Sequence, residues 1–207
     1  MRWLVLMILL TAGQALAAAE PLDPAGAPAP VRRAVFRAEL AHGRGDVDEA
    51  VTILQSCLDG GEDRSHPALR YRLGAYLLEQ DRTDDALPHL QAAAELAPGA
   101  PPVWTDLARA TYETGRYARA ARAFAQAHAA MDAQFHDGHD EHDPPDPSLL
   151  YYAGVSWILA EHPAEAVDVL APLAAAVNDT VPVAWVQALV SAAAELDQPE
   201  RAAAGVA

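Results

Sequence analysis

The chain has 207 residues, enough for one domain or two small ones, and 52% of its residues are hydrophobic but only 6% aromatic. Alanine fills 48 positions, and alanine favours helices over strands, so the composition argues against a β-sandwich or β-barrel. A formal net charge of −15 argues against nucleic-acid binding, which needs a basic surface. With a single cysteine, a disulfide within these residues is excluded.

Residues 1–19 have the layout of a secretory signal peptide. Arg2 precedes eight consecutive apolar residues, and small residues that follow permit cleavage after Ala17 or after Ala19. The apolar run is shorter than the roughly 20 residues that span a bilayer, and an uncleaved membrane anchor is the alternative. We expect a periplasmic or secreted protein without a transmembrane span. Cleavage removes Arg2 and no acid, so the net charge goes from −15 to −16.

Residues 20–30 form a Pro/Ala-rich linker. Four prolines fall in these eleven residues, a density that favours an extended, semi-rigid tether over a packed element. The folded part is therefore expected to begin near Val31 and to occupy residues 31–207.

Small and large apolar residues then recur with a period of 34. One window carries Leu73, Ala86, Leu90 and Ala93, and the next carries Leu107, Ala120, Phe124 and Ala127. Together with Gly74, Pro98 and Trp104, this pattern resembles the tetratricopeptide repeat, a pair of antiparallel helices. The resemblance implies an all-α fold, an α-α superhelix (a tetratricopeptide-repeat solenoid) of about four to five helix-turn-helix repeats, because one pair alone cannot bury its apolar face.

The predicted repeats lie near residues 31–64, 67–100, 101–134 and 147–180, with a partial repeat at 182–207. The first precedes the second by 36 residues, and the fourth follows the third by 46, which places a His/Asp-rich insertion at 135–147. Turn residues fall between the two helices of each pair, at 45–46, 81–83, 115–116 and 161–163.

The resemblance also implies a concave groove that is lined by the first helix of each pair and binds a protein or peptide. In this register the groove presents Tyr71, Arg72, Arg109, Tyr112, Tyr151 and Tyr152. Tyrosine and arginine dominate protein-binding hot spots, although the same tyrosines can instead fill gaps between helices. All 14 basic residues are arginine, which argues against the lysine-based clamp by which many members of the family hold a C-terminal carboxylate.

The insertion is a second candidate site. His136, His139 and His142 recur at a spacing of three, interleaved with carboxylates that include Asp140. Imidazole and carboxylate ligands suit zinc, nickel or copper. The alternative is a solvated acidic loop, since a histidine-rich tract is compositional evidence only.

Common catalytic motifs are missing from the sequence, among them HExxH, GxSxG and the phosphate-binding loop. We therefore expect neither an enzyme nor a cofactor. The sequence predicts an interaction scaffold or assembly adaptor in the bacterial cell envelope, associated with an assembly or export complex. The alternative is a periplasmic metal-binding or metal-sensing protein that uses the His/Asp-rich loop.

Overall fold

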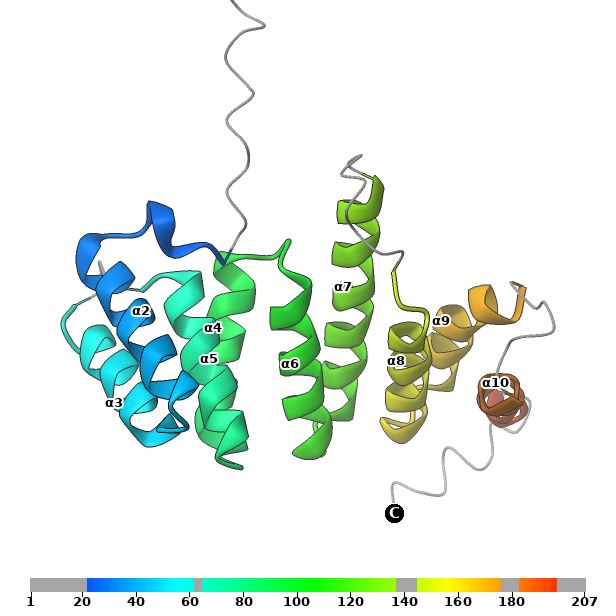
Figure 1. Cartoon of the computed structure of the whole chain (residues 1–207). Helices are drawn as coiled ribbons and strands as arrows, with labels where there is room; N and C mark the ends of the chain where they lie inside the picture. The colour runs from blue at the N-terminus through cyan, green and yellow to red at the C-terminus, as the bar shows by residue number, and fades with distance from the viewer. Residues whose placement is uncertain (1–21, 62–64, 137–144, 176–182, 197–207) are drawn as a thin grey trace, which may run out of the picture.

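The computed structural model describes residues 22–61, 65–136, 145–175 and 183–196. Figure 1 shows helices standing side by side in chain order, and the described residues contain no strand. After a short 3-10 helix, η1 (Pro24–Gly26), the helices are α2 (Ala29–Gly43), α3 (Val47–Leu58), α4 (Pro67–Glu79), α5 (Thr83–Leu96), α6 (Pro101–Glu113), α7 (Tyr117–His136), α8 (Ser148–Leu159), α9 (Pro163–Ala175) and α10 (Val183–Leu196). The signal peptide expected at residues 1–19 lies outside the described residues.

These helices form four antiparallel pairs, α2/α3, α4/α5, α6/α7 and α8/α9, and α10 packs on α9 and α8 as the first helix of a further unit. The expected fold class, a superhelix of about four to five helix-turn-helix repeats, is therefore confirmed. The repeats follow one another without a break in the stacking, because each second helix also contacts the first helix of the next pair.

The turn inside each pair is marked by one residue with a left-handed backbone. These residues are Gly45, Asp81, Gly115 and Glu161, with φ of 83°, 58°, 72° and 62°. They are spaced by 36, 34 and 46 residues (45 to 81, 81 to 115, 115 to 161), which are the offsets of the apolar pattern. A left-handed residue ends a helix and reverses the chain, so the period of the sequence is also the period of the backbone.

Close approach between the two helices of a pair depends on a small residue that faces a large one. Gly74 of α4 faces Leu90 of α5, and a Cβ atom at Gly74 would lie 2.7 Å from Leu90 Cγ. Gly154 and Leu170 are related in the same way in the fourth pair. Part of the alanine and glycine content is thus explained by packing, because larger side chains in these slots would push the helices apart.

The packed part of the chain begins before Val31. The Asp23 side chain accepts a 2.8 Å hydrogen bond from the Ala25 N–H at the start of η1, and Ala27 is 2% exposed. Leu22 packs partly against the core. Proline fits the first turn of a helix, so this proline-rich stretch forms η1 and then enters α2 where an extended tether was expected.

The row of repeats is curved because its two layers, the first helices and the second helices of the pairs, are unequally spaced. At three of the four steps along the row, α2 to α4, α4 to α6 and α8 to α10, first helices contact one another more closely than successive second helices do; α6 to α8 is the exception. The first helices therefore lie on the inner side of the curve. Across the described residues, every helix is too short or too polar to cross a membrane.

Candidate functional site

Charged side chains join the first helices of neighbouring repeats on the inner side. Arg72 of α4 donates from Nε to Glu39 Oε1 of α2 over 2.6 Å. His42 of α2 lies 2.8 Å from Glu79 Oε2 and stacks on the Tyr76 ring, with 4.5 Å between ring centroids. We call this face of α2, α4, α6 and α8 the first-helix surface. Its polar groups are held in place before any partner arrives.

Between α4 and α6, the Tyr71 hydroxyl and the Asp106 carboxylate lie close enough to influence each other's pKa. Burial raises the pKa of Tyr71 to about 12, and the neighbouring Asp106 carboxylate adds to the effect. Burial also raises the pKa of Asp106, while Arg109, 3.4 Å away, and the Tyr71 hydroxyl act in the opposite direction. The tyrosine is therefore neutral at physiological pH.

The six residues predicted from the repeat register divide by what they contact. Tyr71 and Arg72 are engaged in the links between repeats. Arg109 has a side chain that is 56% exposed, and Tyr112 is 38% exposed with its ring 5.5 Å from that of Tyr117. These four residues share the adjoining helices α4 and α6, which the structure brings together.

The other two predicted residues lie further along the row, on α8. Tyr151 stacks on Trp185 of α10, with 5.8 Å between ring centroids, so it fills a gap between helices. Tyr152 is 48% exposed and lies beside Phe124 of α7 at 5.6 Å. Of the pair, Tyr152 is the more exposed.

Sequence reasoning missed Glu39, His42 and Tyr76 as parts of this surface. The sequence separation of the paired residues could have revealed these contacts, since Glu39 and Arg72 are 33 residues apart and His42 and Glu79 are 37 apart. Both separations are close to one repeat length. Side chains at similar register positions on successive first helices lie side by side in a stacked solenoid.

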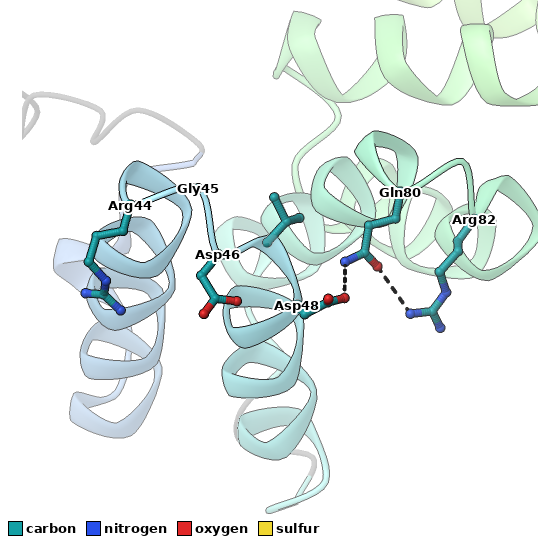
Figure 2. Close-up of a pocket in the computed structure, with 7 residues that line it drawn as sticks. Arg44, Gly45, Asp46, Asp48, Gln80 and Arg82 are labelled. Atoms are coloured by element: carbon teal, nitrogen blue, oxygen red, sulfur yellow. Dashed lines mark hydrogen bonds between the residues drawn. The ribbon is translucent and has the colours of Figure 1, made fainter.

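A pocket of about 650 Å³ opens at the turns of the first two repeats (Figure 2). Gln80 lies between Asp48 and Arg82, donates to Asp48 Oδ1 over 2.8 Å and accepts from Arg82 over 3.4 Å. At the other end of the pocket, Arg44 pairs with Glu49 at 2.7 Å. The polar side chains of this pocket largely form hydrogen bonds and ion pairs with one another, and these contacts connect the neighbouring turns.

The predicted metal ligands fall mostly beyond the described residues. His136 is the last residue of α7, and its Nε2 lies 3.4 Å from Asp132 Oδ1. His139, Asp140 and His142 lie outside the described residues. Within the parts of the chain that the structure describes, no three His, Cys, Asp or Glu side chains are grouped as a metal ion would require.

Comparison with known proteins agrees with this architecture. A tetratricopeptide-repeat family model matches residues 77–137. MamA from Desulfovibrio magneticus RS-1 is similar in structure at 15% identity and a TM-score of 0.56, covering 85% of this chain and 90% of that one. YrrB, described as a TPR protein with an unusual peptide-binding site, is similar at 20% identity and a TM-score of 0.53, covering 76% and 73%.

A search of curated protein sequences gave no significant match. At identities of 15% and 20%, the likeness to MamA and YrrB concerns the fold alone. The sequence pattern, the helix pairs and the family match nevertheless agree with one another. Residues 77–137 thus match the tetratricopeptide-repeat family, and the same helix-pair architecture continues on both sides of them.

Proposed function

We propose that this protein is a non-catalytic adaptor that binds a protein or peptide on the first-helix surface, in the bacterial cell envelope. The observation that carries the proposal is the pair of contacts, Arg72 with Glu39 and His42 with Glu79, that order side chains between neighbouring first helices. A surface that is already ordered loses little conformational entropy when a partner binds.

The exposed groups on this surface suit a peptide with both apolar and acidic side chains. Tyr112 and Tyr152 provide aromatic area, and Arg109 provides a cation whose only ion pair within the described residues is with Asp106 on its own helix. Rigid aromatic side chains supply contact area at low entropic cost, and arginine binds carboxylates in a fixed geometry. YrrB, with the same fold, is described as having a peptide-binding site, which supports the class of ligand.

The envelope location rests on residues 1–19, whose positive start, apolar run and small residues are typical of an exported protein. Mass spectrometry of the protein recovered from a bacterial periplasmic fraction tests it directly. We expect a mature N-terminus at residue 18 or 20. Recovery of the uncleaved chain in the cytoplasm would contradict the proposed location.

The binding surface is tested with a paired substitution, Arg109→Ala with Tyr112→Ala. The tagged protein is cross-linked in a periplasmic fraction, and the partner is identified by mass spectrometry. We expect the double variant to lose that partner while its helical circular dichroism stays unchanged. Phe135→Ala with Arg82→Ala is a matched control, because it also removes one exposed aromatic ring and one exposed guanidinium, from positions outside the first helices. Equal capture by wild type and the first-helix variant would refute the assignment.

A further inference from the structure

A second cleft lies between α5 and α7, the second helices of two neighbouring repeats. It measures about 530 Å³, and we call it the α5–α7 cleft. Leu87 and Gln91 lie on its α5 side, Leu107 and Thr111 of α6 lie at its base, and Arg119 and Arg122 lie on its α7 side. Because second helices are on the outer side of the curve, the cleft lies away from the first-helix surface.

Arginine side chains give the α7 side of the cleft a positive charge. Arg116 Nη2 lies 3.3 Å from Asp84 Oδ1 across the cleft, and the Arg122 guanidinium carbon lies 5.4 Å from the centroid of the Trp157 ring. Arg119 is exposed, and within the described residues its guanidinium makes neither an ion pair nor a hydrogen bond. Asp84 and Glu95 are the acids that line the cleft, so three cations face two anions in a chain of net charge −15.

The position of Arg119 is acidic in the other repeats. With the offsets of 36, 34 and 46 residues, it corresponds to Glu49, Asp85 and Glu165, each in the first turn of its second helix. Acidic residues there are favourable, because the first turn of a helix carries partial positive charge. The first turn of α7 contains no acidic residue. Helix stability therefore does not explain the arginine.

The preceding repeat supplies an internal comparison. The cleft between α3 and α5 has nearly the same size, about 520 Å³. Asp85 and Pro88 line it at the positions that Arg119 and Arg122 occupy one repeat later. Arg82 lines it at the position of Arg116. The shape of the cleft is therefore a consequence of stacking repeats, whereas Arg119 and Arg122 are specific to the α5–α7 cleft.

We propose that the α5–α7 cleft binds an acidic peptide, with a carboxylate on Arg119 and an apolar side chain against Leu87 and Leu107. Charge complementarity selects this occupant, since three arginines line the cleft in a chain whose net charge is −15. From Asp84 to Glu95 the cleft follows eleven residues of α5, about 17 Å at 1.5 Å per residue. That length accommodates about five residues of extended chain.

Fluorescence anisotropy with two labelled hexapeptides tests the proposal on the full chain. One peptide alternates leucine with glutamate, and the other alternates leucine with glutamine. We expect the glutamate peptide to bind and the glutamine peptide to bind at least ~10-fold more weakly, with an affinity that falls as salt is added. Arg119→Glu is expected to weaken the glutamate peptide ~10-fold or more. Arg37→Glu is the matched control, because it makes the same change of charge at an exposed arginine of α2 and leaves binding intact.

Equal affinity for the two peptides would overturn the proposal, as would equal weakening by Arg119→Glu and Arg37→Glu, which would indicate a long-range effect of net charge. Absence of binding up to ~1 mM peptide would overturn it too. The Arg109→Ala/Tyr112→Ala variant is expected to keep the part of the glutamate-peptide binding that depends on Arg119. A failure here is thus separate from a failure of the first-helix surface.

Discussion

Arg119→Glu is expected to make the protein more stable although it removes the binding charge of the α5–α7 cleft. Arg119 is the third residue of α7, which begins at Tyr117. A cation in the first turn opposes the partial positive charge of the helix start, and an anion complements it. A residue that lowers local stability while lining a cleft is the pattern that binding sites in natural proteins show.

The size of the gain follows from two contributions. Removing the unfavourable cation and adding a favourable anion are each worth about 0.3–1 kcal/mol at an exposed helix start. The new carboxylate also lies three residues from Arg116 and three from Arg122, and each such pair adds about 0.2–0.5 kcal/mol. Allowing for competition with the existing Arg116–Asp84 pair, we expect a net gain of about 1–2 kcal/mol.

Thermal unfolding followed by circular dichroism measures this gain. For a chain of this size 1 kcal/mol raises Tm by roughly 2–4 °C. The gain should shrink in high salt because exposed charges are screened, and Arg119→Gln should give a smaller gain than Arg119→Glu. Arg37→Glu, inside α2, should give none. A Tm for Arg119→Glu at or below that of wild type in low salt would refute the reasoning about the helix start.

Three further predictions concern packing and pH. Gly74→Ala should destabilise the protein. A Cβ atom 2.7 Å from Leu90 Cγ costs about 1–3 kcal/mol, which outweighs a helix-propensity gain of about 0.5–1 kcal/mol. In urea unfolding, the destabilisation by Gly74→Ala should be smaller when Leu90→Ala is also present. Tyr71→Phe should cost about 1–3 kcal/mol, because it removes the hydroxyl that favours the charged form of Asp106. The pKa of Tyr71 is about 12 in the folded protein and 10.0 ordinarily, so the unfolded chain loses the hydroxyl proton first as the pH rises. The wild type should therefore lose stability between pH 10 and 12, and Tyr71→Phe should lack this part of the loss. Burial, with a neighbouring guanidinium, lowers the pKa of His89 below its ordinary 6.5. The unfolded chain therefore binds the proton first, stability falls as pH drops below 6.5, and His89→Gln should reduce that fall.

The helix pairs were predictable because their signals are local and repeated. Turn residues such as Gly45 and Gly115 sit at fixed offsets from the small and large apolar positions, so the sequence alone locates each reversal. The proline-rich entry was misjudged because proline suits both an extended tether and the first turn of a helix. Composition alone does not distinguish an extended tether from a helix start. The packing of Ala27 and Leu22 on the core distinguishes them.

Partners of individual side chains were harder to predict. The repeat register predicted that Arg72 lies on the first-helix surface. Two acids, Glu39 and Asp106, lie on the first helices on either side of it, and only the side-chain rotamers decide which of the two pairs with Arg72. Tyr151 was expected in the groove, and its stacking on Trp185 was not foreseen because it depends on how α10 packs against α8. A search for opposite charges one repeat apart would have found the link from Glu39 to Arg72.

Helix α6 supports both proposed surfaces, and this decides which substitutions are informative. Leu107 and Thr111 face the α5–α7 cleft, and Thr111 is buried with its hydroxyl donating to the Leu107 carbonyl over 2.7 Å. Arg109 and Tyr112 are exposed on the same helix. Truncating Leu107 would disturb both surfaces through the core, so a loss of binding in that variant would identify neither. Exposed side chains on α6 and α7 separate them: Arg109 and Tyr112 report on the first-helix surface, and Arg119 reports on the cleft.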